Sequence, residues 1–127
     1  MNEEARHHGD VLNKMYQQLK VVFDGSEQGI YLYLDNIHKV CNKRFASLLG
    51  YDEPRDWAAV EPVEDFVAEQ SLETLVSAYQ NAMSHYAGST IRVSWKKKNG
   101  SILDTTVILV PIGYEGHLFA LHFISPV

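Results

Sequence analysis

The six histidines are the side chains of this sequence that could most readily bind a metal or move a proton near neutral pH. They are His7, His8, His38, His85, His117 and His122. Tetrahedral zinc needs three or four convergent ligands. His7 and His8 are neighbours, which do not share one face of a helix. His38, His117 and His122 fall in separate predicted strands, with no carboxylate at metal-ligand spacing. We therefore predict structural histidines and no metal site.

Carboxylates are the second group that could do chemistry, but no catalytic motif accompanies them. Eight of the 16 acidic residues fall between Asp52 and Glu73, where we expect solvated loop acids. The sequence has no Gly-x-Ser-x-Gly elbow, phosphate-binding loop, HExxH motif or paired cysteine and histidine. One alternative stays open, a small isomerase with a single buried acid, for which Asp104 is the only candidate within a strand. We otherwise predict that the chain is not an enzyme.

The composition indicates one small soluble domain. The mass is 14.4 kDa, 46% of the residues are apolar, and 11 basic against 16 acidic side chains give a formal charge of −5. This acidic balance gives no electrostatic reason to expect nucleic acid or an anionic membrane as a partner. No apolar run approaches the roughly 20 residues of a membrane span. The single cysteine, Cys41, excludes an intramolecular disulfide and favours a reducing compartment, so we expect a cytoplasmic protein.

Residues 3–23 have the periodicity of an amphipathic helix. The three-and-four spacing of a coiled-coil seam is followed by Ala5, His8, Leu12, Met15, Leu19 and Val22. An isolated helix of this length is marginal in water, so it must dock on another surface. It could dock on either of two surfaces, its own domain or the same helix of a second chain. The second possibility predicts a homodimer with contacts from Leu12, Met15, Leu19 and Val22.

Alternating residues and turn signals predict short elements in the next part of the chain. Residues 29–34 and 38–41 are predicted strands joined by a polar turn. Asn42 is a suitable N-cap for a short helix, which Gly50 ends. A short helix that begins with a proline follows, and the clearest helix of the sequence covers residues 71–88.

The last third of the chain has the period of two that is typical of strands. Residues 90–97, 101–110 and 117–124 are predicted strands, and the two turns between them make a meander. The last two strands are apolar on both faces, which requires that both faces of the sheet be covered. The central helices can cover one face and the N-terminal helix the other. The whole order predicts a five-stranded antiparallel sheet of the α+β class.

Four segments in this order resemble the PAS (sensory box) family over residues 26–124. They are Gly29-Ile30 with Asp35, the helix segment from Asn42 to Tyr51, the hairpin Lys98-Asn99-Gly100-Ser101, and Pro111-Ile112 followed by Gly116. Asn99 stands where the family usually has aspartate. The resemblance implies the PAS fold with strand order 2-1-5-4-3, helices on one face and a role in signal sensing. We accordingly expect an N-terminal amphipathic helix over residues 1–24 and a sensor domain over residues 25–127.

Two cofactor-binding branches of this family can be compared with the sequence residue by residue. The flavin photosensors carry a reactive cysteine after the Gly-Tyr pair, whereas Cys41 precedes that helix, so flavin adduct chemistry is not supported. The haem branch commonly uses a histidine on the long helix, and His85 stands at the very end of it, where the helix dipole favours a cation whatever its function. Haem ligation is therefore not supported, and the cofactor stays unknown.

The predicted pocket lies between the sheet and the central helices. Its aromatic and apolar wall is expected to contain Leu32, Phe45, Trp57, Phe66, Val76, Tyr79 and Trp95, with His122 as the polar anchor if its side chain points inward. A packed core without a ligand is the alternative.

The leading functional hypothesis is a sensory module that binds a small molecule or relays a conformational change. The resemblance implies an output domain of the histidine kinase or diguanylate cyclase type, in cis or in trans, as in bacterial two-component signalling. A ligand-free dimerisation module is the alternative. Because the sensory fold and one helix occupy the 127 residues, we expect this chain to be a fragment of a larger signalling protein.

Overall fold

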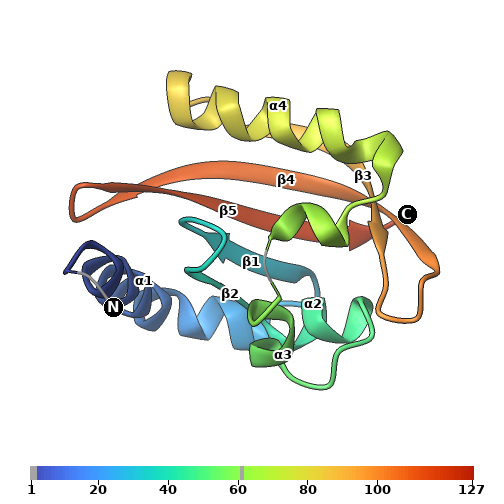
Figure 1. Cartoon of the computed structure of the whole chain (residues 1–127), viewed down its shortest axis with the longest axis horizontal. Helices are drawn as coiled ribbons and strands as arrows, with labels where there is room; N and C mark the ends of the chain where they lie inside the picture. The colour runs from blue at the N-terminus through green and yellow to red at the C-terminus, as the bar shows by residue number, and fades with distance from the viewer. Residues whose placement is uncertain (1–2, 61) are drawn as a thin grey trace.

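The computed structural model describes residues 3–60 and 62–127, which form a five-stranded antiparallel sheet with helices on both faces (Figure 1). The strand order β2-β1-β5-β4-β3 confirms the order that the resemblance implies. The elements in chain order are α1 (Glu3–Gly25), β1 (Gly29–Tyr33), β2 (Lys39–Cys41), α2 (Lys43–Leu48), α3 (Pro54–Ala58), the 3-10 helix η1 (Val63–Phe66), α4 (Glu69–His85), β3 (Ser89–Lys96), β4 (Ile102–Tyr114) and β5 (His117–Pro126).

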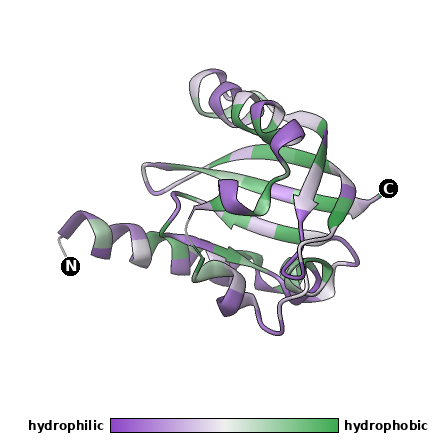
Figure 2. Ribbon diagram, turned by 45° about the vertical axis from the view of Figure 1, so that its right-hand side comes forward, coloured by the Kyte–Doolittle hydropathy of each residue, from purple (hydrophilic) through white to green (hydrophobic). Residues whose placement is uncertain are grey.

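The two faces of the sheet are buried under different helices. In Figure 1, α4 lies on one side of the β4–β5 hairpin and α1 on the other. On the α1 face, Ile30, Leu32, Phe119 and Leu121 pack against apolar residues of α1. Figure 2 shows that the strands carry mostly hydrophobic residues, whereas the helices are striped with hydrophilic ones. Because both faces are covered, the last strand is buried on both sides, as its composition predicts.

The predicted dimer seam is used within the chain itself. Leu12 and Met15 are only 7% and 6% exposed, because they pack on the sheet together with Val11. Leu19 is partly buried against the same cluster, and Val22, at 47% exposed, points away from it. The seam therefore docks the helix on its own domain, and the prediction that Leu12 and Met15 form a contact between two copies is wrong for this arrangement.

Asn42 connects three elements through its side chain. Its Oδ1 accepts hydrogen bonds from the backbone N–H of Phe45 and of Ile30, both at 2.9 Å. Its Nδ2 donates to the carbonyl oxygens of Phe23 at 3.1 Å and Gln28 at 3.0 Å. The side chain thus caps α2, as its position in the sequence predicts, and also holds the end of α1 against the start of β1.

The β4–β5 hairpin is longer than the sequence predicts. β4 continues to Tyr114, which pairs with His117, so the connection is only Glu115 and Gly116. Both residues have positive φ, 48° and 78°, the combination of a type I′ turn, which matches the twist of the flanking strands. The strand predicted for residues 101–110 is therefore four residues too short at its end.

The long helix also differs from its predicted bounds. α4 starts at Glu69, two residues before the predicted start, and ends at His85. Tyr86, rather than Gly88, adopts the left-handed conformation that ends it, with φ of 57°. The Tyr86 hydroxyl accepts a hydrogen bond from the backbone N–H of Gly113 at 3.0 Å, which fixes this end of the helix to β4.

Within the described residues, none of the helices is both long and apolar enough to span a bilayer.

Candidate functional site

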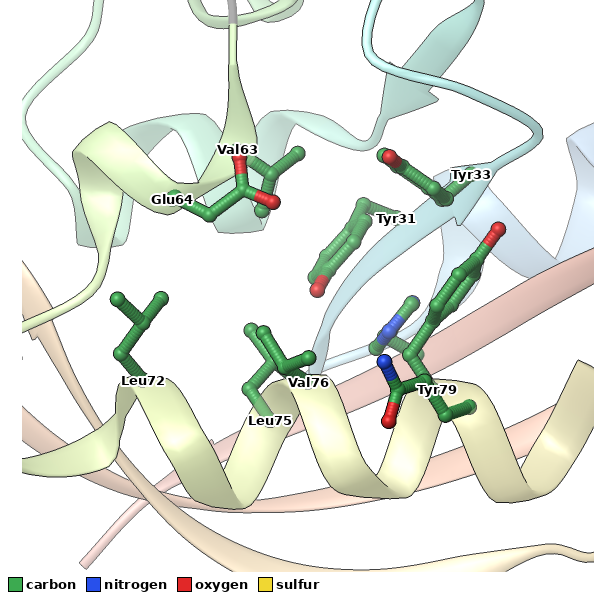
Figure 3. Close-up of a pocket in the computed structure, with 10 residues that line it drawn as sticks. Tyr31, Tyr33, Val63, Glu64, Leu72, Leu75, Val76 and Tyr79 are labelled. Atoms are coloured by element: carbon green, nitrogen blue, oxygen red, sulfur yellow. The ribbon is translucent and has the colours of Figure 1, made fainter.

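A cavity of about 260 Å³ lies between the sheet, η1 and α4 (Figure 3). The strands contribute aromatic side chains from β1 and one histidine from β5, and the helices contribute mainly aliphatic side chains. The lining residues are Tyr31, Tyr33, Val63, Glu64, Leu72, Leu75, Val76, Tyr79, Gln80 and His122.

The cavity has a buried floor and a partly exposed rim. The floor consists of the four buried lining residues, which are Tyr31, Val63, Leu75 and His122. The other lining residues are partly or fully exposed, and Glu64 and Gln80 are the polar ones among them. A small molecule could therefore enter from solvent past the rim and bury its apolar part against the floor.

The floor is built around a stacked pair of rings. The imidazole of His122 and the ring of Tyr31 have centroids 3.8 Å apart and planes only 9° apart. The two residues face each other because β1 and β5 are antiparallel neighbours in which Tyr31 and His122 are directly paired. Burial lowers the pKa of His122 to about 3, so the imidazole is neutral at physiological pH. Its Nδ1 is buried without a hydrogen-bond partner among the described residues, although backbone groups of Tyr31 and Ala120 act to raise the pKa and offset part of the effect of burial.

Three tyrosines place hydroxyl groups along the cavity. Figure 3 shows the Tyr31 hydroxyl pointing toward Leu75 and Val76 of α4, and burial raises the pKa of Tyr31 well above its usual value. The rings of Tyr33 and Tyr79 meet edge to face at 5.3 Å, and the Tyr33 hydroxyl donates to Oδ1 of Asn36 at 3.0 Å. The wall therefore offers neutral hydrogen-bonding groups in an apolar surrounding.

Apart from Leu32, the structure divides the predicted pocket residues into two groups. Val76, Tyr79 and His122 line the cavity. A second group packs tightly below it, with ring centroids between 5.3 and 5.5 Å for the pairs Phe45–Trp57, Phe45–Trp95 and Trp57–Phe66. These four aromatic residues are core rather than wall, since their rings fill the space that the prediction left for a ligand. Tyr31 connects the two groups, because its ring also contacts Phe45, Trp57 and Trp95.

The placement of Leu32 in the pocket is wrong. Its side chain is fully buried on the opposite face of the sheet, under α1. Successive residues of a strand point to opposite faces, so the inward residues of β1 are Tyr31 and Tyr33. Both faces of β1 are apolar, and the alternation alone could not decide which face belongs to the cavity.

The other lining residues that sequence analysis missed had weaker signals. Leu72 and Leu75 lie one turn before Val76 and Tyr79, so helical periodicity could have found them. Val63 and Glu64 lie in the irregular segment before α4, where no periodicity exists to be read.

Asp104, the acid on which the isomerase alternative depends, lies outside the cavity. It is exposed, and its Oδ1 accepts a hydrogen bond from the Ser94 hydroxyl at 2.6 Å. Asp104 therefore does not provide the buried acid that the isomerase alternative requires. His85 is exposed at the end of α4 and does not line the cavity.

Cys41 is buried in the core, and burial raises the pKa of its thiol to about 12. Its Sγ lies 3.8 Å from the carbonyl oxygen of Pro54. A protonated, inaccessible thiol is a poor nucleophile, so Cys41 has the properties of a structural residue.

A second cluster contradicts the expectation that His38 has no carboxylate at metal-ligand spacing. Nδ1 of His8 is 3.0 Å from Oδ2 of Asp35, and Nδ1 of His38 is 2.9 Å from Oδ1 of the same carboxylate. Burial acts to raise the pKa of Asp35, but hydrogen bonds from the side chains of His38 and His8 and from the backbone N–H groups of His38 and Ile37 together hold it below its usual value. Asp35 and His38 are three residues apart in the same turn, whereas the docking of α1 on the sheet brings His8 to them from 27 residues before Asp35.

No protein-family model matches this sequence, and no curated protein matches it. Solved structures do resemble its fold. A PAS domain from a two-component sensor histidine kinase superposes with a TM-score of 0.70 at 11% identity, covering 91% of this chain and 98% of that one. The PAS domain of an HTR-like protein from Haloarcula marismortui has a TM-score of 0.65 at 20% identity, with 96% and 99% covered.

A third similar structure contains a small molecule. It is the PAS domain of a LuxR-family transcriptional regulator from Burkholderia thailandensis in complex with ethanol. It superposes with a TM-score of 0.66 at 14% identity, covering 85% of this chain and 96% of that one. With this strand order and these similar structures, the chain has the PAS fold.

Proposed function

We propose that this chain is a sensory module that binds a small, largely apolar molecule with one hydrogen-bonding group. The observation that carries the proposal is the buried floor of the cavity, where the stacked His122 and Tyr31 present polar atoms inside an apolar wall. A buried polar atom without a partner costs free energy, and a ligand that supplies a hydrogen bond would remove that cost. Apolar pockets with a few convergent polar groups are the usual form of ligand sites.

The size of the cavity limits the ligand class. A volume of about 260 Å³ lies just below the usual range for drug-sized ligands, and it equals roughly nine water-sized volumes. This favours a short alcohol, a phenol or a compound of similar size over a haem or flavin. The ethanol complex of the Burkholderia thailandensis domain shows that one protein of this fold holds so small a molecule.

The sheet offers a direct route from the cavity to α1. Tyr31 and His122 face the cavity, while their neighbours Leu32 and Leu121 face α1 from the same two strands. A ligand that displaces either ring would shift the strands on which the N-terminal helix rests. We propose that this movement is read by an output domain, in cis or in trans, of the histidine kinase or diguanylate cyclase type.

We propose that the protein is located in the cytoplasm. The only cysteine is a buried free thiol with a raised pKa, which a reducing compartment preserves.

Phenol is a suitable probe for the cavity, because it combines one ring with one hydroxyl group. We expect phenol to shift the amide NMR signals of Tyr31, Val76 and His122 in the native chain. Val76→Phe, which fills the cavity, should abolish these shifts, whereas Ser77→Phe on the exposed face of α4 should leave them intact. Native mass spectrometry of the freshly purified protein tests for a ligand that it already carries. Absence of both an adduct and any titration at millimolar phenol would contradict the proposal.

A second candidate function is dimerisation through a different part of α1. Val21 and Val22 lie near the end of the helix and are 85% and 47% exposed, so this exposed part of α1 could contact a second copy. Sedimentation of the native chain and of the Val21→Lys, Val22→Lys double variant tests this surface. A native chain that stays monomeric at high concentration would contradict it.

A further inference from the structure

The structure points to a binding site for a divalent transition-metal ion between α1 and the β1–β2 turn, and we propose that His8, Asp35 and His38 are its ligands. One ligand atom from each of these residues lies within 4.8 Å of the other two. The site is separate from the cavity, because none of the three residues lines it. The proposal therefore does not depend on the proposed sensory function.

The distances are close to those of a coordination shell. Nδ1 of His8 and Nδ1 of His38 lie 3.0 and 2.9 Å from oxygens of the Asp35 carboxylate. Around tetrahedral zinc, with metal–ligand bonds of about 2.0–2.2 Å, donor atoms lie about 3.3–3.5 Å from one another. The ion would be admitted if the nitrogens moved a few tenths of an ångström away from the oxygens and the two nitrogens, which lie within 4.8 Å of each other, took a similar separation. On binding, each neutral imidazole would carry its proton on Nε2, so that the lone pair of Nδ1 faces the ion.

The carboxylate is held in place before any ion binds. Oδ1 of Asp35 accepts hydrogen bonds from the backbone N–H groups of Ile37 at 2.9 Å and of His38 at 2.8 Å, which form an Asx turn. The side chains of His8 and His38 are only 24% and 13% exposed, so their rings have little freedom. In the part of the chain that the structure describes, Asp35 has no ion pair with lysine or arginine, and both of its ionic partners are histidines.

Further histidines surround the three proposed ligands. The ring of His117, at the start of β5, lies 5.1 Å from that of His8, and the ring of His7 lies 4.9 Å from that of His117. Four of the six histidines in the sequence thus gather at one end of α1, although they come from three separate segments. A fourth coordination position could be filled by water or by His117.

The donor set selects the kind of ion. Two imidazole nitrogens and one carboxylate oxygen suit zinc, nickel or copper, whereas magnesium and calcium prefer shells made of oxygen. The expected ligand is therefore Zn²⁺ or a similar ion. Its effect would be mechanical, since it would tie the first turns of α1 to the β1–β2 turn.

The test is calorimetric titration of the full chain with ZnCl₂, after chelator treatment and without a polyhistidine tag. We expect one Zn²⁺ per chain and no heat from MgCl₂. His8→Ala and His38→Ala should each weaken Zn²⁺ binding at least about ten-fold. His85→Ala is the matched control, because this exposed histidine lies on α4 outside the cluster, and it should bind like the native chain.

Hydrogen exchange provides a second readout that tests the position of the ion. Zn²⁺ should slow amide exchange in the first half of α1 in the native chain but not in His8→Ala. Binding that survives in the His8→Ala, His38→Ala double variant, or that is lost equally in His85→Ala, would overturn the proposal. Half an ion per chain accompanied by dimerisation would also overturn it, because the ion would then bridge two copies.

Discussion

The imidazole of His122 lies face to face with the ring of Tyr31, with centroids 3.8 Å apart, at the floor of the cavity between the sheet and α4. The stack buries a titratable group, since the His122 side chain is only 2% exposed. Protonation would put an unpaired charge into this apolar floor, which explains the lowered pKa.

The first prediction concerns stability and pH. The pKa of His122 is about 3 in the folded protein and about 6.5 in an unfolded chain. Between these values the unfolded chain binds more protons, so the free energy of unfolding decreases as the pH falls below about 6.5. We expect His122 to account for a loss of about 1.4 kcal/mol at pH 5.5 relative to pH 8. Urea unfolding at both pH values measures it.

His122→Phe is the control for this prediction, because phenylalanine can stack on Tyr31 but does not titrate. The other ionisable groups contribute equally to both proteins. The native chain should therefore lose more stability on acidification than the variant, and equal losses would contradict the prediction.

The second prediction concerns Asn42, whose side chain makes four hydrogen bonds to backbone groups. Asn42→Ala leaves these groups without partners and should lower the free energy of unfolding by about 3 kcal/mol or more. Asn42→Asp keeps both acceptor contacts but turns the two donor contacts into repulsion between oxygens. It should cost about 2 kcal/mol, measured by urea unfolding. If Asn42→Asp left the free energy of unfolding unchanged, the residue would act only as the cap of α2.

The third prediction distinguishes the two faces of α1. Leu12→Asp buries a charge beneath the helix and should cost at least about 3 kcal/mol or detach α1 from the sheet. Val21→Asp changes a side chain that is 85% exposed and should change stability by less than about 0.5 kcal/mol. Thermal unfolding and hydrogen exchange of α1 compare the two variants. Equal stability would contradict the docking of α1 on its own sheet.

The fourth prediction concerns the β4–β5 turn. Glu115 has a φ of 48°, which costs about 1 kcal/mol for an ordinary residue and less for asparagine. Glu115→Asn creates the Asn-Gly pair that type I′ turns prefer. It also removes the 3.6 Å ion pair with Lys14, but this pair is exposed and contributes little. We expect a net gain of about 0.5–1 kcal/mol in urea unfolding, whereas Glu115→Ala should show no gain.

Much of the fold could be predicted from local patterns in the sequence. The change of period from 3.6 to two separates helices from strands, and Asn42 and Gly50 mark the ends of α2, where Gly50 has a φ of 87°. The two-sided apolar pattern of β5 predicts that both faces of the sheet are covered, and α1 is the element left to cover the second face. These features follow from the types and spacing of residues close together in the sequence. They can therefore be predicted without knowledge of the tertiary contacts.

The candidate sites depended on contacts that the sequence does not contain. Both faces of β1 are apolar, so only the docking of α1 against Leu32 decides that Tyr31 faces the cavity. Which aromatic rings fill the core and which line a cavity is decided by how their volumes pack together. In the same way, His8 and Asp35 are 27 residues apart in sequence and meet only because the helix packs across the sheet. Local patterns determined the elements of this protein, and the packing of α1 and α4 on opposite faces of the sheet decided which side chains meet.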